Sequence, residues 1–415
     1  MNNKISTRLR IRWLLLGLLV PMMAHADEDD ALNLVTSVNW QYLDNVFYLP
    51  DGAKPTAFGP KAPRADSSWV ANVGLNFDKM LGRQKLTASA TQTAVRYNKL
   101  GDLDYDGHNL AAGWQWVLGN DLTGKLSYTN RRYLAGFGDF RSTRLVQNLI
   151  DAQALRFDAA YRIDPYWSLF GSVGHDTQRN SQRVREPNDF DIDRLEGGVR
   201  YTTRGGTTFE LLARNSDGNF PKRVSGLGAS NSYTQQDIEA RVRWQPFGHS
   251  RVSAAIGQSS RDHDDRPDRD YDDVYGRLSW EWQPTGQTGV TFKAERQISA
   301  LDDFVTSYFR TTTYSIAPVW QPTGKLRFDG LMQWVSRDAQ GSTILSGLSP
   351  ATLALFGISA TPRQEDLATY SLGATWSILR NLSASAEARY DERESNVQFY
   401  QYRVRSVSMS LQYVF

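Results

Sequence analysis

The chain ends in the stretch SVSMSLQYVF, residues 406–415, and this stretch decides the fold class. Its apolar residues alternate one by one with polar residues: Val407, Met409, Leu411, Tyr413 and Phe415 stand against Ser406, Ser408, Ser410 and Gln412. Successive side chains of a strand point to opposite faces, so a strand here has one apolar and one polar face. A period of two therefore predicts an amphipathic final strand rather than a helix.

The same alternation runs through the chain in segments of about ten residues, for example at 69–78, 109–118, 155–163 and 238–244. We identify about eighteen segments, the first near residues 32–42 and the last at 401–415. The short connections between them include 119–121, 164–165, 204–206, 246–248, 322–324 and 380–381. The long connections are 43–67, 98–108, 134–152, 180–190, 217–231, 260–271, 298–308 and 336–364.

Short and long connections in alternation are typical of an outer-membrane barrel, with turns on the periplasmic side and loops outside. An apolar sheet face in lipid cannot leave an edge unpaired, because each unpaired backbone group costs several kcal/mol there. We therefore predict an all-β protein: a transmembrane antiparallel up-and-down β-barrel of about 18 strands in the bacterial outer membrane. A terminal Phe415 on an amphipathic strand resembles the signal that barrel insertases recognise; the alternative is an ordinary edge strand.

An internal repeat supports hairpins of two long strands. The sequences 244-WQPFG-248, 282-WQPTG-286 and 320-WQPTG-324 recur every 38 residues. Each Trp is expected to end a strand at the lipid–water boundary, and Pro and Gly to form the tight turn. Propeller blades repeat at a similar length but need four short strands per repeat.

The composition agrees with a barrel and not with a helical membrane protein. The chain has 415 residues, no Cys, 40% hydrophobic residues and a mean hydropathy of −0.50. Three Arg, an apolar run at 13–20 and Ala24-His25-Ala26 predict a signal peptide at 1–26, followed by the barrel at 27–415. Without that segment the chain has 47 − 4 = 43 basic and 45 acidic residues, so no bulk charge favours nucleic acid.

Charged residues fall at positions of opposite parity to the apolar ones, so we expect them to face a water-filled interior. Facing lipid, each would cost up to about 2–4 kcal/mol. Two interpretations stay open: an ion-pair network that stiffens the wall, or an arginine ladder that guides acidic sugars. The predicted pore-lining residues are Arg156, Arg162, Arg200, Arg214 and Arg243.

No catalytic, cofactor or metal site is predicted. The five His residues form no triad with Ser and Asp; His108 and His263 are assigned to outer loops, His249 to a turn, and His175 to an apolar parity. The acidic segments 102–107 and 262–270 leave calcium between loops open, although Gly113 replaces the Glu that an EF-hand needs. The apolar stretch 344–358 lies in the longest loop and is expected to fold inward as a constriction or plug, or to cover the mouth.

Residues 40–140 carry a family resemblance. The segments 43-LDNVFYLPDG-52, 76-NFDK-79, 103-LDYDG-107 and 114-WQWVLGN-120, followed by 161-YRIDP-165, resemble the outer-membrane protein of exopolysaccharide operons associated with the exosortase B/PEP-CTERM system, the EpsL family. The resemblance implies export or assembly of an extracellular polysaccharide, with a polysaccharide chain and periplasmic export or assembly proteins as partners. It assigns no catalytic residue.

The predicted function is a passive outer-membrane channel for a polysaccharide, not an enzyme, with outer-membrane lipid around it. A general or solute-specific porin is the first alternative. A non-conducting scaffold or a barrel enzyme is the second. A TonB-dependent receptor is disfavoured, because no plug domain precedes the first segment.

Overall fold

A computed structural model describes residues 31–138, 146–223, 230–299, 308–340 and 362–415. The predicted signal peptide and the apolar stretch 344–358 lie outside these residues. Among the described residues the sheet has 18 antiparallel strands, so the predicted fold class is confirmed. No described helix is long and apolar enough to cross a membrane.

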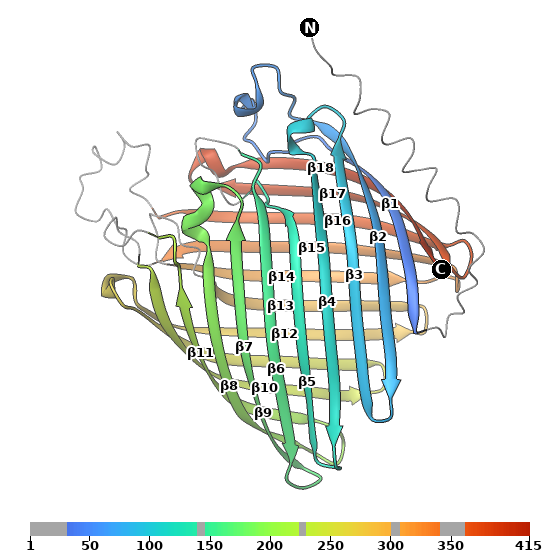
Figure 1. Ribbon diagram of the computed structural model, residues 1–415, viewed down its shortest axis with the longest axis vertical. Helices are drawn as coiled ribbons and strands as arrows, with labels where there is room; N and C mark the ends of the chain where they lie inside the picture. Colours follow the sequence, from blue (N-terminus) through green and yellow to red (C-terminus); the bar gives the residue numbers. More distant parts are fainter. Residues whose placement is uncertain (1–30, 139–145, 224–229, 300–307, 341–361) are drawn as a thin grey trace.

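Each strand pairs with its sequence neighbours, as in an up-and-down barrel (Figure 1). The strands are β1 Leu32–Leu43, β2 Asp66–Leu81, β3 Gln84–Tyr97, β4 Tyr105–Leu118, β5 Leu122–Leu134, β6 Leu149–Arg162, β7 Trp167–Asn180, β8 Phe190–Thr202, β9 Thr208–Asn219, β10 Ser232–Phe247, β11 Ser250–His263, β12 Tyr271–Thr285, β13 Thr288–Ser299, β14 Tyr308–Trp320, β15 Leu326–Gln340, β16 Gln364–Ser377, β17 Leu382–Ser395 and β18 Tyr402–Val414. Short 3₁₀ turns lie between them: η1 Thr56–Phe58, η2 Gly101–Leu103, η3 Arg183–Asn188, η4 Pro267–Arg269 and η5 Gln398–Tyr400.

The C-terminal strand closes the barrel. β18 pairs with β1 from Val35↔Val414 to Leu43↔Ser406, and with β17 on its other side. Because β1 and β18 pair with each other, neither edge of the sheet faces lipid. The alternation of the last ten residues thus forms the seam on which the closed fold depends.

The apolar faces point outward. Leu195, Ile238, Ile256 and Leu372 are each more than 60% exposed, while acidic neighbours such as Glu196 and Glu239 are at most 7% exposed. A soluble protein would bury this apolar surface, whereas a lipid bilayer covers it. Because a closed barrel with an apolar exterior is the form in which strands cross a membrane, the chain is an outer-membrane β-barrel.

Two of the three Trp-Gln-Pro repeats end their strands later than the sequence predicts, whereas β14 ends at Trp320 as predicted. Pro246 and Phe247 belong to β10 and Pro284 belongs to β12, so the turns lie one or two residues further along. The strand register shifts between Trp244 and Phe247, and the repeat at Trp282 shifts in the same way. Proline cannot donate to the ladder, so the strand bulges at this point instead of ending.

Two further positions differ from the sequence prediction. His108 lies within β4 rather than in a loop, because its strand begins at Tyr105. The turn between β2 and β3 consists of Gly82 and Arg83 and was not among the predicted short connections. Gly82 has φ of +60°, a conformation that a residue with a Cβ rarely adopts. His263 ends β11, and His175 has the apolar parity that was predicted for it.

Candidate functional site: the inner wall of the barrel

Four carboxylates on three adjacent strands are buried on the inner face of the barrel wall. They are Glu196 on β8, Glu210 on β9, and Asp237 and Glu239 on β10, and each is at most 7% exposed. Their neighbours along each strand are the exposed outward residues, so these side chains point into the barrel. Buried carboxylates need charged partners, because an unpaired ion in such a place is costly.

Arginine side chains supply these partners. Arg214 donates through Nε and Nη2 to one oxygen of Glu196, at 3.0 and 2.7 Å. Arg200 and Arg243 both donate to Oε1 of Glu210, at 2.7 and 2.6 Å. A guanidinium that donates to a carboxylate from a neighbouring strand fixes both side chains in place.

The network continues across β10 to β12. Glu239 accepts hydrogen bonds from Arg241 and, at 2.8 Å, from Arg277. Asp237 lies 3.6 Å from Arg214, whose other amino group holds Glu196. Arg241 approaches Glu210 to 3.6 Å, so it connects the two halves of the network.

Within this network the two charge types lie at different depths. Its four carboxylates are nearly inaccessible, whereas the side chains of Arg214, Arg241, Arg200, Arg277 and Arg243 are 25, 25, 33, 47 and 57% exposed. Two inward carboxylates beside the network, Asp158 and Glu281, are exposed. A solute in the barrel therefore meets guanidinium groups, although the network holds both signs. We call these inward residues of β6, β8, β9, β10 and β12 the charged wall.

Two recesses open on the charged wall. One of about 200 Å³ is lined by Arg156, Arg194, Arg214 and Glu196 among others. A larger one of about 560 Å³ is lined by Arg241, Arg243, Arg277 and Lys293, together with Glu210, Glu281 and Glu295. Both hold polar groups that could make short-lived contacts with a polar solute.

Four of the five predicted pore-lining residues come together in this network: Arg156, Arg200, Arg214 and Arg243. Arg162 does not. It ends β6 at the periplasmic turns, where it donates to Asp121 at 2.9 Å and to the carbonyl of Asn120 at 2.7 Å. Arg241 and Arg277 were among the inward charges in the sequence but were not selected, because parity alone does not reveal which neighbours share a carboxylate. That these residues line a pore stays a prediction.

Four strands on the opposite side of the barrel, β18, β1, β2 and β3, carry few inward charges. Their inward positions include the polar or small residues Ser406, Ser408, Ser410, Gln412, Ser37, Asn39, Gln41, Asn72, Gly74, Asn76, Thr87, Ser89, Thr91 and Thr93. Thr93 donates to Asn72 at 2.7 Å and Asn72 donates to Ser37 at 3.0 Å, which shows that these side chains share the inner face. We call this set the neutral wall.

At the inward positions of these four strands, charged residues occur only near the strand ends. The carboxylate of Asp66 lies at the extracellular end and accepts the backbone N–H groups of Lys99 and Leu100, at 2.9 and 2.8 Å. Asp78 and Lys85 form an ion pair of 2.8 Å at the periplasmic end. Between these levels the polar groups of the neutral wall are hydroxyls, amides and the backbone, interrupted by the inward side chains of Val35 and Val70.

Three loops fold into a cap over the neutral wall. Residues 44–65, 98–104 and 135–138 form an apolar core in which Phe47 and Leu103 are fully buried. Phe47 stacks on Phe58 with ring centroids 4.9 Å apart and meets Phe137 edge-on at 5.0 Å. We call these loops the cap.

The cap reaches across the barrel mouth. Gly138, which follows β5, accepts a hydrogen bond of 2.9 Å from Arg393 on β17. Asn45 donates to the carbonyl of Arg403 at 3.0 Å, beside β18. Beneath it the inward residues Val95 and Val404 are buried, so the cap packs on the inner face of the wall. The inward fold predicted from the sequence was in residues 344–358, outside the described residues, and the cap was not predicted.

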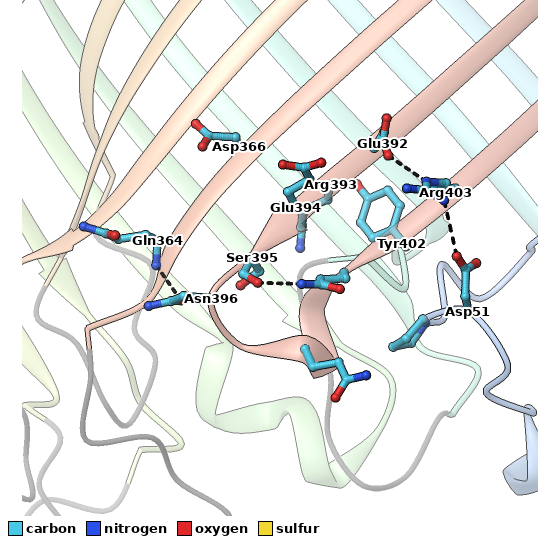
Figure 2. A pocket seen from close by; sticks show the side chains of 13 residues that line it. Asp51, Gln364, Asp366, Glu392, Arg393, Glu394, Ser395, Asn396, Tyr402 and Arg403 are labelled. Atoms are coloured by element: carbon cyan, nitrogen blue, oxygen red, sulfur yellow. Dashed lines mark hydrogen bonds and ion pairs between the residues drawn. The ribbon is translucent and has the colours of Figure 1, made fainter.

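A separate recess of about 430 Å³ lies at the extracellular rim, between β16, β17, β18 and η5 (Figure 2). Arg403 joins Glu392 at 2.6 Å and Asp51 at 3.6 Å there. Glu394 and Asp366 are opposite each other in register, on the outward parity of their strands. This recess is therefore not part of the inner wall.

Groups of three or more His, Asp and Glu that could hold a metal ion are absent from the described residues. His175 pairs with Asp193 at 2.7 Å, on the outward face. The predictions of no metal, no cofactor and no catalytic residue stay predictions.

Comparison with solved structures finds outer-membrane proteins of low sequence identity. The outer-membrane protein OpdK of Pseudomonas aeruginosa, solved with vanillate, is 11% identical, covers 92% of this chain and 99% of its own, and has a TM-score of 0.49. OccK2 (OpdF) of the same organism, solved with glucuronate, is 12% identical with a TM-score of 0.48, and the alignment covers 92% and 98% of the two chains. The siderophore receptor PirA, also from P. aeruginosa, is 10% identical with a TM-score of 0.46, covering 94% of this chain and 81% of its own.

These structures are similar to the chain in fold, and no function is taken from them. No family model matches the sequence, and no curated protein matches it. The EpsL resemblance therefore gains no support from the family models.

Proposed function

We propose that the barrel is a passive outer-membrane channel of the porin type and that its charged wall favours anions. The observation that carries the proposal is the difference in depth on that wall, where buried carboxylates hold exposed guanidinium groups in place. An 18-stranded barrel is wide enough for water to enter. Fixed cationic groups in such an interior raise the local concentration of anions.

The experiment is the reversal potential of the purified barrel in a planar bilayer under a KCl gradient. The proposal expects a chloride-to-potassium permeability ratio above one. Arg243→Gln should lower that ratio, because it removes the most exposed guanidinium of the network while Arg200 still holds Glu210.

Arg162→Gln is the matched control. It removes the same charge at a site outside the network, and its effect should be smaller. A ratio below one in the unmodified protein, or equal effects of the two variants, would contradict the proposal. Absence of conductance would favour the non-conducting scaffold instead.

The polysaccharide channel remains a second proposal, which rests on the resemblance of residues 43–52 and 103–107 to the EpsL family. Residues 43–52 lie in the cap or directly before it, and 103–107 run from its second loop into β4. A strain that lacks the gene should then retain polymer in the periplasm. Normal surface polymer in that strain would exclude export and leave the porin proposal intact.

The partners also stay predictions: a polysaccharide chain and periplasmic export or assembly proteins. The same holds for the absence of enzymatic activity. A barrel enzyme would need an acid–base or Ser–His cluster on the inner wall, whereas the network of β8 to β12 consists of Arg–carboxylate pairs.

A further inference from the structure

The charged wall and the neutral wall face each other. β10 lies nine strands from β1 in either direction around the barrel, so the two strands are diametrically opposed. β10 carries Asp237, Glu239, Arg241 and Arg243, whereas the inward residues of β1 carry no charge. A solute inside the barrel therefore has guanidinium donors on one side and neutral hydrogen-bonding groups on the other.

The neutral wall keeps part of its hydrogen-bonding capacity free. The side chains of Ser408 and Ser410 on β18 are partly exposed, and their hydroxyls make no side-chain hydrogen bond within the described residues. By contrast, the donors and acceptors of the charged wall are largely engaged with each other. The neutral wall can thus exchange contacts with a solute at little cost to itself.

We infer that the preferred solutes are acidic saccharides, that is, carboxylates that also carry several hydroxyl groups. The inference rests on the proposed anion-favouring channel. The guanidinium groups attract the carboxylate, and the amides and hydroxyls of the neutral wall replace the water that the sugar hydroxyls lose. A carboxylate without hydroxyl groups gains contacts from the charged wall only. A neutral sugar gains contacts from the neutral wall only.

The spacing of the neutral wall suits this role. Ser406, Ser408 and Ser410 repeat along one face of β18, and Asn39 and Gln41 lie opposite Ser410 and Ser408 on β1. Neighbouring groups of this kind offer a row of weak, similar contacts instead of one tight site. A solute can then move from one contact to the next, as passage through a channel requires.

The test compares two ring carboxylates of similar size, galacturonate and cyclohexanecarboxylate, as potassium salts in a planar bilayer. Reversal potentials give the permeability of each anion relative to potassium for the full-length barrel. We expect galacturonate to be at least about twofold more permeant than cyclohexanecarboxylate, the effect of a single weak hydrogen bond.

The variant S406A/S408A/S410A should bring the two permeabilities together and leave the chloride-to-potassium ratio unchanged. The matched control is T36A/S67A, with the same kind of change on the outward parity of β1 and β2; it should keep the difference. Should the triple variant fail to fold, Ser408→Ala alone and the comparison in the unmodified barrel still decide the question.

The outcomes separate the two proposals. Equal permeabilities in the unmodified barrel, or a difference that survives S406A/S408A/S410A, would overturn the inference even when chloride is preferred over potassium. A preference for potassium over chloride would overturn the proposed function itself. A galacturonate preference that is lost in S406A/S408A/S410A but kept in T36A/S67A supports both proposals.

Discussion

The charged wall and the neutral wall belong to the same sheet and have the same alternation, yet they are stabilised in different ways. On the charged wall, side chains of β8, β9 and β10 hold one another through ion pairs with inaccessible carboxylates. On the neutral wall, short side chains make few contacts with each other, and the cap covers its extracellular end. The comparison shows that the alternation along a barrel strand determines only which side chains point inward. The residue types at the inward positions then determine which groups a solute in the interior can contact.

The largest expected effect is on the charged wall. Arg214→Met removes the bidentate partner of Glu196 and a close partner of Asp237, both of them buried. Breaking a buried ion pair from one side typically costs about 3–5 kcal/mol, because the remaining charge stays desolvated. Urea unfolding of the refolded barrel in lipid vesicles measures this, and a loss below about 1 kcal/mol would show that water already solvates the network.

A loss of about 3 kcal/mol, confined to the cap, is expected for Phe47→Ala. The side chain is fully buried between Phe58 and Phe137, in a core that no strand of the barrel needs for its pairing. Limited proteolysis should then cut residues 46–62, while the barrel keeps its urea midpoint. Unfolding of cap and barrel together would mean that the cap is part of the cooperative unit.

A smaller loss, about 1 kcal/mol, is expected when a hydrogen-bonded residue of the neutral wall is truncated. Asn72→Ala removes the acceptor of Thr93 and the donor to Ser37, but leaves no buried charge behind. The same urea experiment measures it. A loss as large as that of Arg214→Met would remove the distinction between the two walls.

The smallest expected effect concerns salt. Screening shortens from about 10 Å at 0.1 M to about 3 Å at 1 M, so the exposed guanidinium groups should lose much of their influence on ions in the barrel. The chloride-to-potassium ratio should fall towards one over this range, by roughly twofold. The galacturonate preference over cyclohexanecarboxylate should persist, since hydrogen bonds are not screened. A preference that disappears with added salt would assign it to the charged wall.

Sequence periodicity predicted most of the fold because a strand in lipid leaves little choice. The alternation predicted about eighteen strands, and the terminal segment 406–415 forms the seam. The prediction was less accurate at two of the three Trp-Gln-Pro repeats, where a proline interrupts the ladder without ending the strand. It was also wrong at His108, because loop length was judged from polarity and β4 begins with polar residues.

The candidate site was predicted only in part. Parity showed that Arg156, Arg200, Arg214 and Arg243 face inward, but Arg162 has the same parity and lies at a turn. Which arginine shares which carboxylate depends on register between strands, as with Arg200 and Glu210, which are direct partners across β8 and β9. No local signal in the sequence contains that register.

The sequence by itself determined that this protein is a closed barrel in a membrane. Apolar and polar residues alternate one by one along its strands, and lipid is what covers the apolar face that results. Only the tertiary structure decided which inward arginines of β6 to β12 share a carboxylate, and that the cap covers β18 to β3. Closure sets β1 opposite β10 and brings the loop after β5 to β17, and these contacts join residues far apart in the chain.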